Sequence, residues 1–195
     1  MGFLVLGLAI FLAAHSVRIF AGDWRAAQIA RLGEKRWKGV YSLVSAIGLG
    51  LIVWGYGQAR ADTLMLWAPP TALRHLAAGL VLPAFILLVA AYLPGTRIKA
   101  KVGHPMVAGV KLWALAHLMA NGSRADLTLF GAFLVWAIAD FISARRRDRA
   151  VGRTYPALGG SRDAIAIGIG FGAWALFAFH GHAWLIGVQP FRIGG

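Results

Sequence analysis

The chain contains no cysteine, so disulfide bonds, iron–sulfur clusters, thiolate ligation of haem and thiol catalysis are all excluded. Charged residues are also scarce: only 7 of 195 residues are Asp or Glu, and Asp, Glu, Lys and Arg together make up 14% of the chain. The sequence lacks a phosphate-binding glycine loop, a nucleophile elbow and a Ser-His-Asp signature. The enzyme classes that these motifs define therefore find no support in the sequence.

Apolar residues dominate instead, at 59% of the chain, and the mean hydropathy is +0.67. A soluble domain of this length has too little interior to bury so much apolar material, so the composition predicts an integral membrane protein. The length suits one compact bundle without a separate soluble domain. We therefore predict a single transmembrane domain over residues 1–195.

Six apolar runs are each long enough to cross a bilayer as a helix of about 20 residues. They cover residues 2–20, 39–58, 72–93, 104–121, 127–144 and 164–187. The first run has no basic N-terminal region and no small-residue cleavage site, and it contains His15 and Arg18, so we expect a retained span and not a signal peptide. The predicted fold class is an all-α, polytopic membrane bundle of six transmembrane helices.

The net charge of +13 is distributed unevenly along the chain. The first, third and fifth loops (21–38, 94–103 and 145–163) hold 14 of the 20 Lys and Arg residues. The second and fourth loops and the C-terminal tail hold only Arg60, Arg74, Arg124 and Arg192. The positive-inside rule then places the odd loops in the cytoplasm and both termini outside. This pattern indicates membrane topology, with the lipid bilayer as partner, and not binding of nucleic acid.

The first loop interleaves apolar and basic side chains, with Trp24, Ile29, Leu32 and Trp37 among five Lys and Arg residues. This pattern predicts a short amphipathic helix on the anionic cytoplasmic leaflet. A simple topology determinant explains the basic residues equally well.

Several polar side chains lie inside the predicted spans, where they mark an interior that faces other helices. On a helical projection of residues 104–121, His104 and Lys111 share one face, whereas His117 lies on another face with Trp113 and Asn121. A satisfied network that fixes helix packing is one interpretation. In that network Asp140 would pair with Arg18 or Lys111, because a lone charge is unfavourable in hydrocarbon.

Histidine chemistry offers sharper interpretations. Neutral imidazoles on facing helices suit axial ligation of haem, whose ring needs apolar walls. A zinc site usually shows His or Glu at i, i+4 spacing, and no such motif is present. A proton relay needs a chain of ionisable groups, yet Asp140 is the only carboxylate well inside a predicted span. Haem ligation is therefore the interpretation that the residues favour.

Several motifs occur in an order that resembles the NnrU family, over nearly the whole chain. These motifs are Leu12-Ala-Ala-His-Ser16, Tyr41-Ser-Leu-Val-Ser45, Trp54-Gly-Tyr56, Gly103-His-Pro-Met106, Lys111-Leu-Trp-Ala-Leu-Ala-His117 and His182-Ala-Trp-Leu-Ile-Gly187. NnrU-like proteins are bacterial membrane proteins associated with nitrite and nitric oxide reduction in denitrifiers. The family also includes the 15-cis-ζ-carotene isomerase of plants and cyanobacteria, which carries haem b.

The resemblance implies a haem b site in the bacterial inner membrane, with His15 and His117 at the positions of the axial ligands. The isomerase branch also has a cysteine three residues before the second histidine, where this chain has Ala114. This departure argues against a mechanism that switches to a thiolate ligand, and it favours the NnrU-type branch over a carotenoid cis-trans isomerase. The expected function is then nitrogen-oxide metabolism or another haem-dependent redox or isomerase reaction, on a hydrophobic small molecule.

Depth along the helices constrains the ligand pair. His15 lies about 20 Å from the outer end of its span and His117 about 20 Å from the inner end of its own, so the two helices need tilt or offset. We keep His15 and His117 as the predicted metal ligands, with His104 and His180 in reserve. His104, Lys111 and Arg18 are predicted to form a charge network or to bind an anionic group such as a haem propionate.

Two alternatives come from other functional classes. Gly103-His-Pro-Met106 is reminiscent of the Arg-His-Pro motif of membrane methyltransferases that use S-adenosylmethionine, but Gly103 replaces the Arg and Val107 stands at the Tyr position. The other alternative is a non-enzymatic membrane assembly factor whose polar interior is structural.

Overall fold

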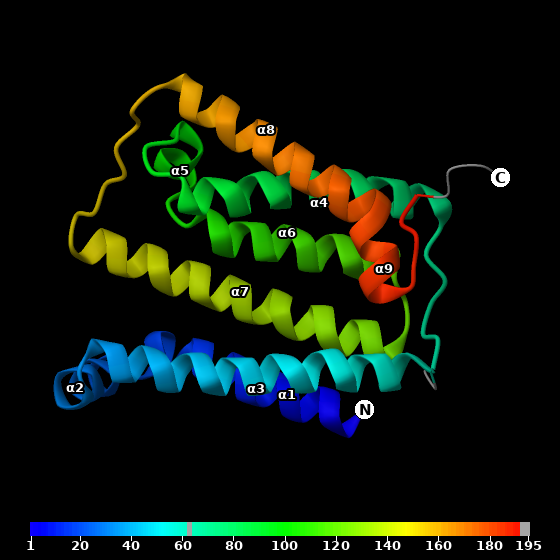
Figure 1. The fold of residues 1–195 in the computed structure, drawn as a ribbon, viewed down its shortest axis with the longest axis horizontal. Coiled ribbons are helices and arrows are strands. Elements are labelled where there is room, and N and C mark those ends of the chain that lie inside the picture. Colours follow the sequence, from blue (N-terminus) through cyan, green and yellow to red (C-terminus); the bar gives the residue numbers. More distant parts are fainter. Residues whose placement is uncertain (62–63, 192–195) are drawn as a thin grey trace.

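The computed structural model describes residues 1–61 and 64–191, so Arg192 of the predicted outer tail lies outside the described residues. The described chain is all-helical, and its apolar segments form helices where the sequence predicts them (Figure 1). The elements are α1 (Gly2–Phe20), α2 (Gly22–Leu32), α3 (Glu34–Ala61), α4 (Thr71–Tyr92), α5 (Arg97–Val102), α6 (Pro105–Ala120), α7 (Arg124–Ala150), α8 (Gly160–Leu176), the π-helical turn η1 (Phe177–Gly181) and α9 (His182–Ile186).

Five helical segments of the described chain are long and apolar enough to cross a membrane: α1, α3, α4, α7 and the continuous run Gly160–Ile186. The chain is therefore a multi-pass membrane protein. The remaining predicted span, α6, is an apolar helix of only 16 residues. A sixth crossing by α6, and the side on which the termini lie, stay predictions.

The helices form two groups that share α7. In one group α1 packs along α3, and in the other α4 packs against both α6 and α8. Figure 1 shows α7 between the α1–α3 pair and α6, and α7 contacts α1, α3 and α6. The cores of both groups thus meet on the surface of α7.

The α1–α3 crossing depends on glycines that let the two backbones touch. A Cβ on Gly55 of α3 would lie 2.3 Å from the backbone nitrogen of Leu4, and one on Gly7 of α1 would lie 2.6 Å from that of Ile52. Close approach of backbones is the usual way in which membrane helices gain van der Waals contact, because lipid already surrounds their apolar side chains. Leu4 and Ile52 are accordingly buried in the core.

Connections alternate between the two ends of the bundle. The helices α2 and α5 lie at one end with residues 151–159, and the N-terminus lies at the other end with α9 (Figure 1). At the N-terminal end, backbone amides of Leu66 and Trp67 donate to the carbonyl oxygen of Gly122 at 2.8 and 3.2 Å, which ties the second connection to the fourth. We call the end that holds α2 and α5 the basic end.

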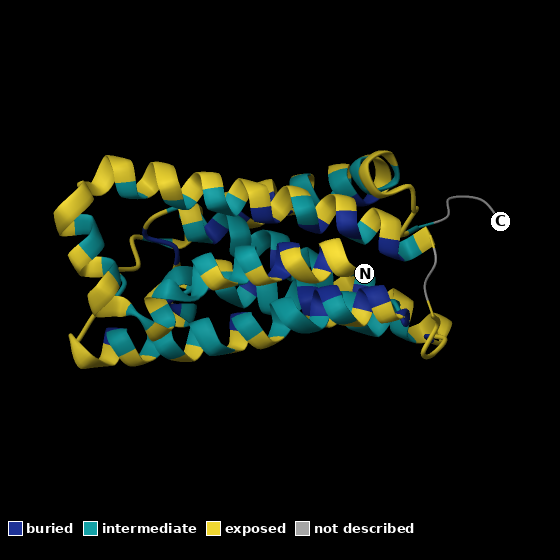
Figure 2. Cartoon of the chain, turned by 90° about the horizontal axis from the view of Figure 1, so that it is seen from below, coloured by how far each residue is buried: buried dark blue, intermediate teal, exposed yellow. Residues whose placement is uncertain are grey.

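The first connection is confirmed as helical, because α2 occupies residues 22–32. The Trp24 and Trp37 rings pack edge to face, with centroids 5.8 Å apart, which holds α2 against the start of α3. Figure 2 shows that most of each long helix is exposed or half-buried, with short buried patches between helices. This distribution is expected of a bundle whose outer surface faces lipid.

Candidate functional site

His15 lies on α1 and points into the interior between α3 and α7. Its ring stacks on Phe11 with centroids 4.0 Å apart, and it also packs against Tyr41 of α3 and Trp136 of α7 at 5.2 and 5.9 Å. Its Nδ1 lies 2.7 Å from the carbonyl oxygen of Phe11. A carbonyl can only accept, so Nδ1 carries a proton, and in the neutral ring the lone pair resides on Nε2.

His117 repeats this arrangement on α6. Its Nδ1–H donates to the carbonyl oxygen of Trp113 at 2.8 Å, one turn earlier on the same helix. The ring stacks on Phe130 of α7 with centroids 4.6 Å apart. In the described part of the chain, Nε2 of neither His15 nor His117 takes part in a hydrogen bond. Both imidazoles are therefore held in the form that can donate a lone pair from Nε2.

Three aromatic rings connect the two histidines. Phe11, stacked on His15, packs against Phe133 of α7 at 5.8 Å, and Phe133 packs against Trp113 at 5.6 Å. Trp113 then contacts His117 at 5.2 Å. The structure thus brings His15 and His117 to one aromatic interior, with the half-buried Phe133 on the path between them.

The two histidines lie at different levels along α7. Trp136 contacts His15, whereas Phe130 contacts His117. A separation of six residues on a helix corresponds to about 9 Å along its axis. The indole N–H of Trp136 is buried and finds no acceptor within the described residues. An unpaired buried donor beside His15 is unusual in a packed interior and is the kind of group that a bound ligand satisfies.

The π-helical turn places another histidine near this interior. The residues of η1 precede His182, whose Nδ1–H donates to the carbonyl oxygen of Val188 at 2.7 Å. His182 and Asp126 both interact electrostatically with His117. His180, the predicted reserve ligand, is exposed in η1. His182, which opens the last motif of the family resemblance, was not among the predicted ligands.

A polar cluster at the start of α7 lies close to His117 and was not predicted from the sequence. Tyr56 of α3 donates its hydroxyl hydrogen to Oδ1 of Asp126. Oδ2 of Asp126 accepts from the backbone amide and hydroxyl of Ser123 at 3.1 and 2.6 Å, and Ser123 caps α7 in return. The Arg60 guanidinium lies over the Tyr56 ring, 5.6 Å from its centroid. The pattern Ser123-x-x-Asp126 is a capping-box signature that is visible in the sequence.

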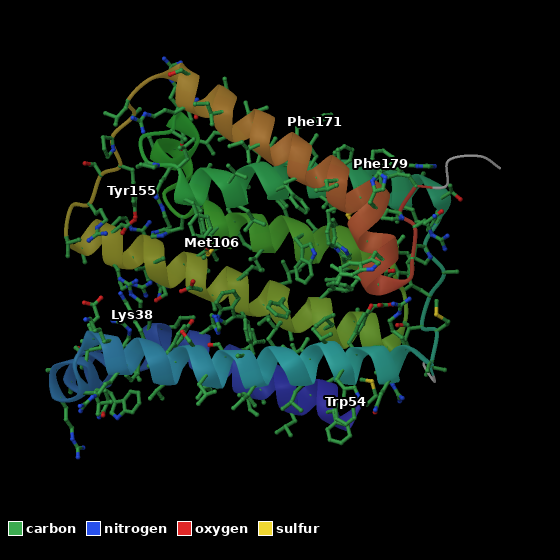
Figure 3. All side chains as sticks on the ribbon, in the orientation of Figure 1. Lys38, Trp54, Met106, Tyr155, Phe171 and Phe179 are labelled. Atoms are coloured by element: carbon green, nitrogen blue, oxygen red, sulfur yellow. The ribbon has the colours of Figure 1, made fainter. Side chains whose placement is uncertain are left out.

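At the basic end, His104 pairs with a carboxylate outside the predicted spans. Its Nε2–H donates to Oδ2 of Asp148 at 2.8 Å, and the Tyr155 hydroxyl donates to the same oxygen at 2.9 Å. Burial, and then the hydrogen bond to Asp148, raise the pKa of Tyr155 above its ordinary value. Figure 3 shows Tyr155 at the same end of the bundle as Lys38, away from Trp54 and Phe179. These bonds tie segment 151–159 to α6 and α7.

Lys111 lies on the same side of α7 as His104. Its ammonium group lies 3.7 Å from the centroid of the Phe141 ring, and His104 packs against the edge of that ring. Within residues 1–61 and 64–191, no carboxylate forms an ion pair with Lys111. Lys111 is therefore a half-buried cation, and the Phe141 ring stabilises its charge in part.

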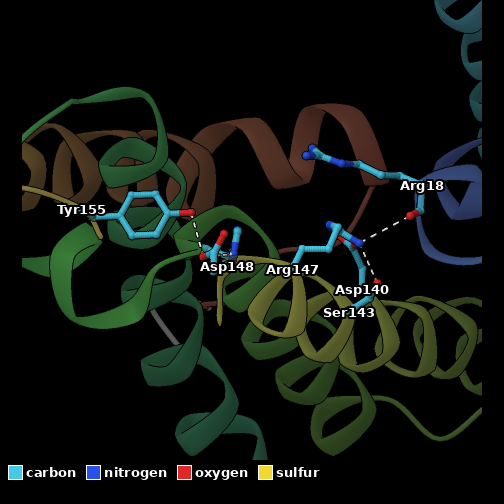
Figure 4. Close-up of polar contacts among 7 residues, drawn as sticks. Arg18, Asp140, Ser143, Arg147, Asp148 and Tyr155 are labelled. Atoms are coloured by element: carbon cyan, nitrogen blue, oxygen red, sulfur yellow. Dashed lines mark hydrogen bonds and ion pairs between the residues drawn. The ribbon is translucent and has the colours of Figure 1, made fainter. Parts of the chain in front are cut away.

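Asp140 pairs with a different residue from the two that the sequence predicted. It lies 3.8 Å from Arg147, two turns later on the same helix, and not against Arg18 or Lys111. Arg147 also donates to the Ser143 hydroxyl at 2.6 Å and to the carbonyl oxygen of Arg18 at 3.4 Å (Figure 4). The physical reason is the face of α7: Asp140 and Arg147 share the face toward α1, and Phe141 faces α6. The predicted charge network is thus divided into two groups, and Arg147 links them because it also interacts electrostatically with Asp148.

The described residues contain no cluster of three or more His, Cys, Asp or Glu side chains that could hold a metal ion. Ligation by two histidines on a prosthetic group needs no such cluster.

Residues 3–190 match the NnrU protein family. No curated protein and no solved structure matches the chain. The match extends over both histidine-bearing helices, the polar cluster at the start of α7 and the π-helical turn. The chain belongs to the NnrU family.

Proposed function

We propose that this protein is a single transmembrane domain of the bacterial inner membrane that binds haem b through His15 and His117. The basic end faces the cytoplasm, because it carries the first, third and fifth connections, which are rich in Lys and Arg. The observation that carries the proposal is that both imidazoles make the same hydrogen bond to their own helix. Each donates Nδ1–H to the carbonyl oxygen four residues earlier, at 2.7 and 2.8 Å.

This hydrogen bond is the kind that accompanies ligation by histidine. It fixes the tautomer and orientation of the ring and makes Nε2 a better donor. The surrounding side chains fit a flat, apolar ring, since Phe11, Trp113 and Phe130 pack on the two histidines. The unpaired Trp136 N–H is available to an acceptor beside His15. These features support a haem group held by two neutral imidazoles, for which the two histidines, about 9 Å apart along α7, would have to reach one level.

The chain's own residues would each contribute a defined part of this site. His15 and His117 would ligate the group. Lys111, without a carboxylate partner in the described chain, would neutralise a propionate on the side of the basic end. When bound, haem b would supply an iron centre for electron transfer.

Ligation by two histidines without a thiolate favours a redox role or an association with nitrite and nitric oxide metabolism over carotenoid isomerisation. The chain has no cysteine to offer as an alternative ligand. The hydrophobic interior suits a small, apolar or weakly polar substrate.

The test is an absorption spectrum of the full chain, purified in mild detergent from haem-replete cells and recorded oxidised and after dithionite. We expect a Soret band and a sharp reduced α-band in the wild type. Both bands should be lost in His15→Ala and in His117→Ala. His75→Ala is the matched control, because His75 starts α4 on the exposed surface and should leave the spectrum unchanged.

A colourless, well-folded wild-type preparation would overturn the proposal. Loss of haem in His117→Ala and His182→Ala, with retention in His15→Ala, would replace the ligand pair by His117 and His182.

A further inference from the structure

An apolar groove lies between α1 and α7. Its volume is about 420 Å³. On α1 the groove is lined by Leu12, Ser16, Ile19 and Phe20, and on α7 by Gly131, Ala132, Val135, Trp136 and Ala139. Positions in both sets recur every three or four residues, so the groove follows one face of each helix. The small side chains Ser16, Gly131 and Ala139 create the hollow.

The row on α7 continues toward the basic end with two polar residues. Ser143 follows Ala139 by four positions, and Arg147 follows Ser143 by four. The Arg147 guanidinium donates to the Ser143 hydroxyl at 2.6 Å and to the Arg18 carbonyl oxygen at 3.4 Å. These bonds hold Arg147 at the end of the groove and beside the last turn of α1, which carries Arg18 (Figure 4).

The groove opens sideways into the space that hydrocarbon would occupy. Val135 is 70% exposed and Phe20 is 80% exposed. Large apolar side chains exposed to this extent on membrane-spanning helices face lipid chains. The occupant of the groove is therefore delivered from the bilayer and carries a hydrocarbon chain.

Arg18 is a cation near the end of the groove that the protein leaves without an ion pair. Arg147 interacts electrostatically with Arg18, with Asp140 at 3.8 Å and with Asp148. In the described chain, no carboxylate forms an ion pair with Arg18. One phosphodiester would neutralise this guanidinium. A guanidinium also offers a planar set of N–H donors that suits phosphate oxygens.

We propose that this groove is a binding site for one anionic phospholipid. An acyl chain lies along the i, i+4 rows of α1 and α7, and the phosphate contacts Arg18 and Arg147 at the level of the headgroups. The headgroup end is separate from the side proposed for a haem propionate, because Arg147 reaches the Arg18 carbonyl oxygen on α1, whereas His104 and Lys111 contact Phe141. The groove and the surroundings of His15 share Trp136. In this arrangement Arg18 binds a lipid phosphate and not a haem propionate.

The test uses the full chain reconstituted in nanodiscs with equal amounts of phosphatidylglycerol and phosphatidylcholine. The complex is released into mild detergent, and native mass spectrometry counts the retained lipids. We expect one phosphatidylglycerol per chain and much less phosphatidylcholine. Each basic residue near an anionic surface contributes about fivefold to binding, so Arg18→Gln/Arg147→Gln should lower phosphatidylglycerol retention about 30-fold.

Two further variants separate this site from general surface charge. Lys35→Gln/Arg36→Gln removes two exposed cations near the start of α3 and should leave retention unchanged. Ala139→Leu fills the groove without changing charge and should lower retention of the lipid. An excess of glycerol 3-phosphate should not compete, because it lacks the acyl chain.

Four outcomes would overturn the proposal. These are equal retention of the two lipids, an equal loss in the Lys35/Arg36 control, unchanged retention in Ala139→Leu, and competition by glycerol 3-phosphate. The last would reduce the site to a simple anion site. None of these results depends on haem, so the lipid site can fail while the haem proposal stands.

Discussion

The α1–α3 crossing makes a quantitative prediction for the variant Gly55→Ala. The new methyl group would lie 2.3 Å from the Leu4 nitrogen and 2.8 Å from the Leu4 Cα. Heavy atoms in favourable contact are about 3.5–4.0 Å apart, so α1 must withdraw from α3 by roughly 1 Å. Both obstructing atoms belong to the backbone and cannot rotate away. We therefore expect destabilisation of about 1–3 kcal/mol, the usual range for overpacking.

The neighbouring variant Gly57→Ala is the matched control. It makes the same chemical change on the same helix, and its Cβ would meet nothing within 4 Å. Alanine forms helix more readily than glycine, by up to about 1 kcal/mol, so Gly57→Ala should be neutral or slightly stabilising. The two variants should differ by about 1–4 kcal/mol in their free energies of unfolding.

The assay is unfolding of each purified variant in dodecyl maltoside micelles by increasing mole fractions of dodecyl sulfate. Far-ultraviolet circular dichroism follows the helix content, and the midpoints report the difference between the variants. Equal midpoints for Gly55→Ala and Gly57→Ala would refute the backbone contact between α1 and α3. Because His15 lies two turns after Gly7 on α1, Gly55→Ala should also weaken haem retention if His15 is a ligand.

Two other predictions concern the ends of α7. Ser123→Ala removes the capping box with Asp126 and should lower the free energy of unfolding by about 1 kcal/mol in the same dodecyl sulfate titration. Ser161 is exposed, so Ser161→Ala should leave the midpoint unchanged. Equal effects of the two variants would contradict the cap. The pKa of Tyr155 is higher in the folded protein than its ordinary value of 10.0. The stability that the protonated Tyr155 hydroxyl contributes is therefore fully present below pH 10.0 and is lost as pH rises through the pKa of the folded protein. Unfolding midpoints from pH 8 to 11 should therefore fall less steeply in Tyr155→Phe than in the wild type, and parallel curves would contradict the bond to Asp148.

Hydropathy located the helices well, but it did not locate their ends. The predicted span 127–144 became α7, which extends over Arg124–Ala150, and the predicted span 39–58 became α3, which begins at Glu34 and ends at Ala61. Apolar runs report where hydrocarbon surrounds the chain. A helix continues past the membrane surface as long as its backbone bonds and caps favour it.

Partners of the polar residues were harder to predict. His104 and Asp148 are 44 residues apart, and Asp148 lies beyond the predicted span, so no local pattern connects them. By contrast, the Asp140–Arg147 pair is spaced by two helical turns, and the Ser123–Asp126 cap is a short-range pattern. Periodicity within α7 could have revealed both. The arrangement of His15, His117 and His182 required the tertiary packing of three different helical segments.

The short length of α6 would have a consequence for the membrane itself if α6 is the sixth span that the sequence predicts. Sixteen residues of α-helix measure about 24 Å, whereas the hydrocarbon core of a typical bilayer is about 30 Å thick. His104 and Asn121 cap the two ends of α6, so polar groups would enter the edges of the hydrocarbon on both sides. Lipids next to α6 would relieve this mismatch by thinning locally. The protein should therefore partition into thinner regions of a bilayer and deform thicker ones around α6.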